Sequence, residues 1–198
     1  MANELTRRNF LKSIGAAVLS VSFLEVLTDE PSNFSFIDIY DPTINSVLSY
    51  FRELHEITPD RNLIKAMIAV ESGSIADREK AFRHDPMQIA NEGDYALNVL
   101  ASGDEHTEMV GDFSFLQGIK YTPRINGRWD YSQTNMTPEA SIRGGVGWLY
   151  HKAAIRNYVS NKLQITGWRT WSEAVRRYNG GGDPAYVHKV FEIKGKLD

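Results

Sequence analysis

The sequence predicts a mainly α-helical protein with one compact domain. Apolar residues recur at helical spacing in several segments, while the alternation typical of strands is scarce. The chain has 198 residues, of which 42% are hydrophobic, and this is enough to bury one core. We therefore expect one helical domain over residues 34–198, preceded by a separate segment over residues 1–33.

The expected helices follow from the positions of apolar and capping residues. Over residues 44–57, apolar side chains recur three and four positions apart and form one helix face. Over residues 58–72, Thr58 is a suitable N-cap, Pro59 suits the first helical position, and Asp60 places an acid in the first turn. Further helices are expected over residues 139–159, 171–178 and 184–193.

Residues 91–135 are expected to form long loops. This stretch is rich in Gly, Asp, Asn and Thr, and its Asn126-Gly127 pair predicts a small hairpin. Loops this long inside a compact domain tend to be lids or binding loops. The domain is therefore expected to carry a long loop insertion.

The N-terminal segment 1–33 is expected to be an export signal and a linker. Arg7-Arg8 and Lys12 precede an uncharged, mostly apolar stretch over residues 13–24, which is typical of a signal peptide. That stretch is shorter than the about 20 residues of a membrane-spanning helix. The Arg-Arg-x-Phe-Leu-Lys pattern resembles the twin-arginine signal, so we expect a periplasmic or secreted protein. No clean cleavage site precedes Glu25, and retention of the signal as a membrane anchor stays open.

Composition argues against several classes of function. The net charge is −3 and the 22 basic residues are scattered among 25 acids, so binding to nucleic acid is not expected. The absence of cysteine excludes disulfides and thiolate chemistry. The five histidines lack paired spacing. One acidic run could hold calcium but lacks the EF-hand pattern and is more typical of a solvated loop: Asp104, Glu105, Glu108 and Asp112. We expect a monomer with no metal and no cofactor.

Glu71 is the candidate general acid. Leu63, Met67 and Glu71 lie four residues apart, so the carboxyl group shares a helix face with two apolar side chains. Apolar surroundings and the C-terminal end of a helix both disfavour a negative charge, which would raise the pKa of Glu71. A general acid needs such a pKa near neutral pH. Alternatively, Glu71 turns outward into solvent.

The motifs around Glu71 resemble those of the soluble lytic transglycosylase family, which shares the lysozyme-like fold with goose-type lysozyme. Glu71-Ser72 resembles the family's Glu-Ser motif, and Met87-Gln88-Ile89 resembles its Gly-Leu-Met-Gln segment. Three later motifs follow in the family's order: Ser141 to Leu149, Trp171 to Gly181 with its Tyr178-Asn179 pair, and Tyr186-Val187. The resemblance covers residues 62–190 and implies a lysozyme-like domain.

The resemblance also implies an activity and a role for each matching residue. Glu71 would protonate the glycosidic oxygen between N-acetylmuramic acid and N-acetylglucosamine in peptidoglycan, and would then take a proton from the muramyl 6-hydroxyl. The product would be a 1,6-anhydro sugar, formed without a second carboxylate. Ser72 and Gln88 would bind sugar substituents. Tyr178 would bond to Glu71 and orient it, and Asn179 would shape the same wall.

Two departures from the family keep alternatives open. His84-Asp85-Pro86 stands where the family has glycines, so Asp85 offers a second acid near Glu71, and Asp94 offers another. Either acid could activate water, which would make the chain a hydrolytic muramidase. The second departure is the insertion, where aromatic and arginine side chains suit either stacking on sugar rings or a satellite core: Tyr121, Arg124, Trp129 and Tyr131.

Three readings of the whole chain therefore remain: a transglycosylase, a muramidase, and a non-catalytic peptidoglycan-binding module on the same fold. The expected partner is the glycan strand in each case. Three roles stay open: remodelling of the cell's own wall, opening of the wall for an assembling machine, and attack on a competitor's wall. The second would add a protein of that machine as a partner, and the third would add an inhibitor protein.

Overall fold

The computed structural model describes residues 34–73, 78–103 and 106–198, and within them the protein is mainly helical. The expected export signal and linker of residues 1–33 lie outside the described residues. The described elements, in chain order, are η1 (Phe34–Tyr40), α3 (Asp41–Leu54), α4 (Arg61–Gly73), α5 (Arg78–His84), α6 (Tyr95–Ser102), η2 (Ser114–Leu116), β1 (Arg124–Ile125), β2 (Arg128–Trp129), α7 (Pro138–Ala153), β3 (Ala154–Val159), β4 (Lys162–Trp168), α8 (Trp171–Tyr178) and α9 (Tyr186–Leu197). None of the helices in these ranges is long and apolar enough to span a membrane.

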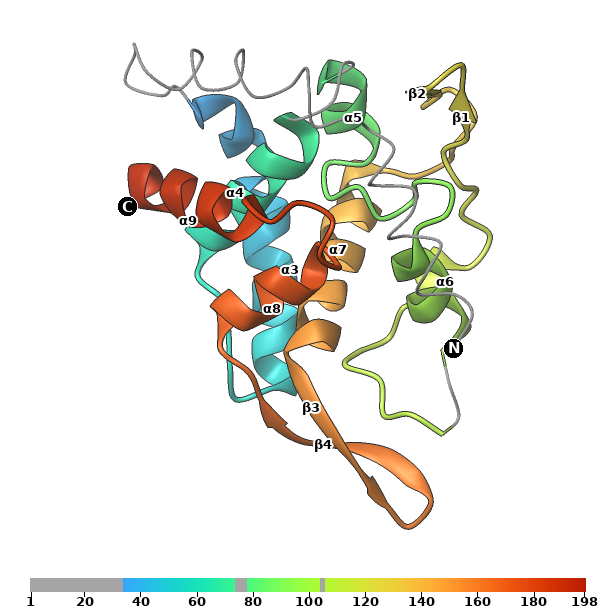
Figure 1. The fold of residues 1–198 in the computed structure, drawn as a ribbon, viewed down its shortest axis with the longest axis vertical. Helices are drawn as coiled ribbons and strands as arrows, with labels where there is room; N and C mark the ends of the chain where they lie inside the picture. Colours follow the sequence, from blue (N-terminus) through green and yellow to red (C-terminus); the bar gives the residue numbers. More distant parts are fainter. Residues whose placement is uncertain (1–33, 74–77, 104–105) are drawn as a thin grey trace.

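Helix α7 runs through the centre of the domain. It packs against α3, α5, α6 and α8, while α4 packs chiefly against α9 (Figure 1). At the core, the rings of Phe51 on α3 and Tyr150 on α7 stack with their centroids 4.5 Å apart. Both side chains are fully buried, and burial of such large apolar groups is the main stabilising contribution to the fold.

Most of the expected helices are present, with shifted ends. The helix expected over 58–72 begins only at Arg61. Asp60, rather than Thr58, accepts the hydrogen bonds from its first turn. The Asp60 carboxylate accepts a hydrogen bond from the Asn62 amide at 2.8 Å, and the Asp60 carbonyl accepts one from Leu63. Helix α8 coincides with the expected range 171–178, and the Thr170 hydroxyl caps it. Helix α9 begins two residues later than expected and extends to Leu197.

The helix expected over 139–159 is wrong in its last part. Helix α7 ends at Ala153, and residues 154–159 form β3, which pairs antiparallel with β4. Ser160 and Asn161 join the strands with φ values of 50° and 63°, as a type I′ turn requires. Residues 106–108 lie along the other edge of β4. The hairpin projects from the helical body (Figure 1), and tertiary pairing overrides the helical pattern there.

The insertion contains more structure than the sequence predicted. Helix α6 lies within the range that we expected to be loop, and the Asp94 carboxylate caps it by accepting from the Ala96 amide. The small hairpin expected at Asn126-Gly127 is confirmed: β1 pairs with β2, and both turn residues have positive φ. Helix α5, just before the insertion, was also not predicted. The insertion is therefore anchored to the domain by short elements of its own.

Candidate active site

Glu71 lies in the last turn of α4 and is partly buried. Its Oε1 atom accepts a hydrogen bond of 2.6 Å from the hydroxyl of Tyr186, the first residue of α9. The Tyr186 residue is only 4% exposed. Burial, followed by the nearby Glu71 charge, raises the pKa of Tyr186 well above its usual value, so its phenol stays protonated. Tyr186 therefore remains a hydrogen-bond donor to the carboxylate throughout the ordinary pH range.

Tyr178, the tyrosine expected to orient Glu71, directs its hydroxyl elsewhere. It donates to the backbone carbonyl of Met87 at 2.9 Å. A phenol has one proton, so in this arrangement it has none left to donate to the carboxylate. Its ring stacks on Tyr186, with 6.5 Å between centroids and 4° between planes. Tyr186 thus takes the donor role expected of Tyr178, and Tyr178 supports Tyr186 and the loop at Met87.

Asp85 does not face a groove, which corrects the expectation of a second acid there. Its side chain is completely buried, and its carboxylate accepts from the Ile89 and Ala90 amides at 3.1 and 2.8 Å. It also accepts from the Ser141 hydroxyl at 2.6 Å. Burial raises the pKa of Asp85, although these hydrogen bonds act in the opposite direction. A carboxylate enclosed in this way holds the loop 85–91 and has no access to an attacking water.

The loop 85–91 is held against α7 by a glycine face. A Cβ atom built on Gly145 would lie 2.5 Å from the Met87 Cβ, and one built on Gly144 would collide with Ile89. The Ser141 hydroxyl accepts from the Met87 amide at 3.0 Å, so it links this amide to Asp85. Glycine costs roughly 1 kcal/mol in a helix interior relative to alanine, and close packing explains its presence here. The Ser141–Leu149 motif therefore positions the loop.

Gln88 sits at the centre of this loop in a left-handed conformation, with φ of 52°. Its Oε1 accepts from the Tyr131 hydroxyl at 2.9 Å and from the Asn91 amide at 2.8 Å, while its Nε2 donates to the Asp85 carbonyl. Gln88 is 7% exposed. Its amide oxygen is thus occupied within the protein, and only one N–H remains for a ligand.

The other two residues expected to bind sugar are placed differently from each other. Ser72 is buried, and its hydroxyl donates back to the Ile68 carbonyl at 2.6 Å, so a direct sugar contact is not supported. Asn179 is partly buried at the end of α8, and its side-chain amide donates to the Asp183 carbonyl. Asn179 also lines a cavity next to Tyr186. Glu71 does not line this cavity, so the expected place of Asn179 in the wall beside Glu71 stays a prediction.

The aromatic residues of the insertion divide between the two roles expected for them, packing in a satellite core and stacking on sugar rings. Tyr131 is 1% exposed and belongs to a buried cluster beside Gln88 and His84. Arg124 lies over the ring of Trp129, 5.6 Å from its centroid, on the β1–β2 hairpin. Tyr121 is partly buried, and burial raises its pKa. The Arg124–Trp129 pair, in which both residues are partly buried, keeps a geometry that suits stacking on a ligand.

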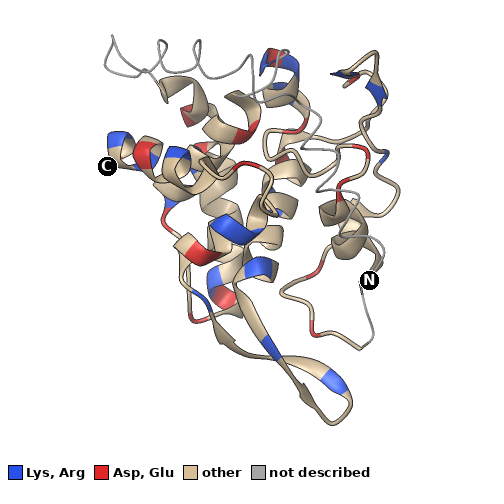
Figure 2. Cartoon of the chain, in the orientation of Figure 1, with Lys and Arg blue, Asp and Glu red and all other residues tan. Residues whose placement is uncertain are grey.

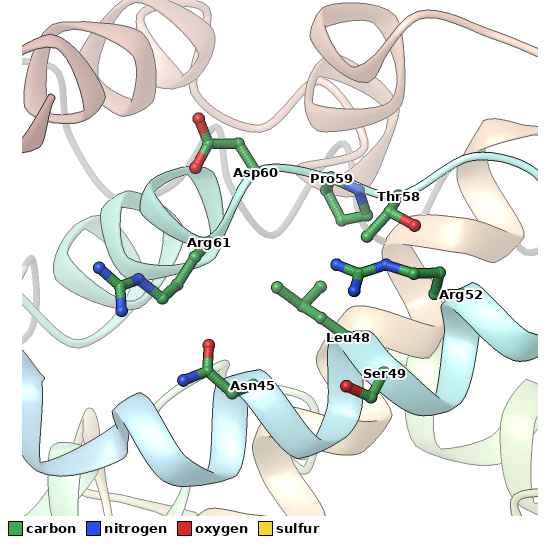
Figure 3. A pocket seen from close by; sticks show the side chains of 8 residues that line it. All are labelled: Asn45, Leu48, Ser49, Arg52, Thr58, Pro59, Asp60 and Arg61. Atoms are coloured by element: carbon green, nitrogen blue, oxygen red, sulfur yellow. The ribbon is translucent and has the colours of Figure 1, made fainter.

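A cavity of about 510 Å³ lies between α3 and the start of α4 (Figure 3). Asn45, Leu48 and Arg52 line its α3 side, and Arg61 pairs with Asp41 at 3.6 Å. This cavity is at the opposite end of α4 from Glu71, roughly 15 Å along the helix axis. We therefore do not include it in the candidate active site.

No cluster of metal-binding side chains occurs among residues 34–73, 78–103 and 106–198. Two members of the acidic run considered for calcium, residues 104 and 105, lie outside these ranges.

Sequence reasoning selected Glu71 and the loop at Gln88. The structure links them through two stacked tyrosines, of which Tyr186 bonds to Glu71 and Tyr178 bonds to the loop at Met87. Sequence reasoning missed Tyr186 as the donor to Glu71. The signal was present in the Tyr186-Val187 pair, but chain spacing does not reveal which tyrosine reaches the carboxylate. Comparison with protein-family models, curated proteins and solved structures finds no match to this chain.

Proposed function

We propose that this protein is a lytic transglycosylase with a lysozyme-like domain that cleaves the glycan strands of peptidoglycan. Glu71 is the acid and the base of the reaction, and it acts on the β-1,4 bond between N-acetylmuramic acid and N-acetylglucosamine. The twin-arginine-like segment supports export, so the protein works in the periplasm or outside the cell.

The observation that carries the proposal is the hydrogen bond from the buried Tyr186 hydroxyl to Glu71 Oε1. It fixes one carboxylate oxygen and so orients the carboxyl group for proton transfer. Glu71 gives its proton to the glycosidic oxygen as the bond to the muramyl anomeric carbon breaks. The muramyl 6-hydroxyl then bonds to that carbon and returns its proton to Glu71, so a 1,6-anhydro sugar forms and no water is consumed.

The burial of Asp85 favours this reaction over hydrolysis. An inverting hydrolase needs a second carboxylate that contacts the attacking water. Both oxygens of Asp85 are occupied by protein donors, and the side chain has no exposed surface. Asp94, the other acid considered, serves as the N-cap of α6. A single carboxylate with the substrate's own hydroxyl as nucleophile is therefore the better-supported chemistry.

The test is digestion of purified sacculi by the whole chain, with the soluble products weighed by mass spectrometry. We expect 1,6-anhydro-muropeptides. Products heavier by one water, with reducing ends, would instead show hydrolysis and reopen the muramidase reading. Absence of soluble fragments, together with binding to sacculi, would show a non-catalytic binding module.

Two variants make the assignment specific. Glu71→Gln keeps the shape of the side chain but removes the exchangeable carboxyl proton, and we expect a loss of at least about 100-fold in rate. Glu53→Gln changes an exposed acid on α3 and should retain full activity. Equal activity of the two variants would contradict the role of Glu71.

A further inference from the structure

A second cavity adjoins the candidate active site through Tyr186. It has a volume of about 640 Å³ and lies between α8 and the chain leading into α9. Tyr186 forms part of its wall while its hydroxyl reaches Glu71, so the same side chain borders both places. The residues that line the cavity are Thr170, Ser172, Glu173, Arg176, Asn179, Gly181, Asp183, Pro184, Tyr186 and Val187.

Arg176 is the notable charge in this cavity. It is exposed, and among the residues that the structure describes it has no ion-pair or hydrogen-bond partner. Ser172 precedes it by four residues, so the two side chains share one face of α8. The cavity therefore presents a guanidinium group and a hydroxyl group side by side.

The two acids in the lining are already paired with cations. Glu173 pairs with Arg169 at 3.4 Å and with Arg177 at 3.2 Å. Asp183 pairs with Lys189 at 2.9 Å and accepts from the Ala185 amide at 2.8 Å. These three cations lie outside the cavity lining and balance its two carboxylates, so the positive charge of Arg176 is left in excess. In Figure 2, α8 carries both acidic and basic positions. The local balance favours an anionic ligand.

We infer that this cavity binds a carboxylate of the peptide attached to the muramyl sugar. The inference rests on the proposed function, because the sugar at Glu71 brings its peptide to the neighbouring cavity. Arg suits a carboxylate because its fork can donate two parallel hydrogen bonds. The polar backbone of the peptide can form hydrogen bonds with three other groups of the lining: the hydroxyls of Ser172 and Thr170 and the side-chain amide of Asn179. Peptide-bearing glycan is thus the preferred substrate, and Arg176 recognises it.

The chain offers a matched control in the next residue. Arg177 lies on the same helix but is paired with Glu173 and is absent from the cavity lining. Arg176→Gln and Arg177→Gln each remove one positive charge from α8. Any effect of net charge or of helix stability alone should appear in both variants.

The experiment compares two substrates: intact sacculi, and sacculi from which an amidase has removed the peptides. Arg176→Gln should lower kcat/KM on intact sacculi by about tenfold, as expected for a lost hydrogen bond to a charged group, and should leave cleavage of the peptide-free glycan unchanged. Arg177→Gln should not discriminate between the substrates. Calorimetry with muramyl dipeptide should show about tenfold weaker binding for Arg176→Gln only.

Two results would overturn the inference while the proposed function stands: an Arg176→Gln variant that matches wild type on both substrates, or one that loses activity equally on both. A wild-type protein that cleaves neither substrate would contradict the proposed function itself, and the inference with it.

Discussion

The Tyr186 hydroxyl donates to the Glu71 carboxylate at 2.6 Å and joins the first turn of α9 to the last turn of α4. The two residues are 115 positions apart in the chain. Tyr186 is buried and its pKa is raised, so the donor does not titrate alongside the carboxylate. This contact couples the position of the candidate acid to the packing of the C-terminal helix.

Removing this hydroxyl by Tyr186→Phe should reduce activity by about 10- to 100-fold, the effect of losing a hydrogen bond to a charged group. The bond favours the ionised carboxylate, so its loss should move the alkaline limb of the pH–activity profile to higher pH. The profile can be measured on sacculi by the release of soluble muropeptides.

Tyr178→Phe is the control for this experiment. It removes the hydrogen bond to the Met87 carbonyl but leaves the donor to Glu71 in place. We expect a lower midpoint of thermal unfolding and an unshifted pH limb. The same pH shift in both variants would contradict the separate roles of the two tyrosines.

Asp85→Asn should destabilise the fold by about 2 kcal/mol and change turnover per folded molecule by less than about tenfold. The Asn amide group brings an N–H against a backbone N–H that the carboxylate accepts. Unfolding in urea gives the free energy of unfolding. The rate of sacculus digestion, divided by the concentration of folded protein, gives the turnover.

A water-activating base would behave differently, since its loss costs about 100- to 10,000-fold in rate. Such a loss in a folded Asp85→Asn protein would restore the hydrolytic mechanism. Asp94→Asn is the comparison, because Asn and Asp are equally good N-caps and little change in stability is expected.

Gly145→Ala should lower both stability and activity. The new Cβ would lie 2.5 Å from the Met87 Cβ, so the loop that carries Gln88 must move. Overpacking of this kind costs about 1–3 kcal/mol. Gly195→Ala in α9 meets no atom within 4 Å and should instead gain up to about 1 kcal/mol. Unfolding curves of both variants, with sacculus digestion, test the prediction; a stabilised Gly145→Ala protein would contradict the close packing.

His151 should make the protein less stable in acid. Burial lowers its pKa to about 3, and the nearby Arg156 and Lys152 act in the same direction. The unfolded chain binds a proton below about pH 6.5 while the folded protein resists it, so the free energy of unfolding falls between pH 6.5 and 3. Above pH 6.5 neither the folded nor the unfolded chain protonates His151, so this loss of stability vanishes.

His151→Gln should therefore remove up to about 1.4 kcal/mol per pH unit from the acid slope of the unfolding free energy. Urea unfolding at pH 7.5, 6 and 5 measures it. His188→Gln, at a side chain that is 83% exposed, is the control for the same substitution at an accessible histidine. An unaltered slope in His151→Gln would contradict the burial argument.

Local patterns in the sequence predicted α3, α4 and α8 well, because their apolar faces and caps depend on residues near one another in the chain. They did not predict β3 and β4. Ile155, Tyr158 and Val159 fit a helix pattern as well as a strand pattern, and the pairing of β4 with both β3 and residues 106–108 decides between them. The N-cap of α6 at Asp94 was available in the sequence but was overlooked within a polar stretch.

What the sequence determined by itself is the helical class and the position of Glu71 at the end of α4. What only the tertiary structure decided is which groups surround Glu71. Tyr178 and Tyr186 lie eight residues apart in the chain but differ in role. Helix α8 directs Tyr178 to the Met87 carbonyl, and α9 directs Tyr186 to Glu71. Asp85 is removed from solvent for the same reason: its donors come from the loop and from Ser141 on α7, which folding alone brings together.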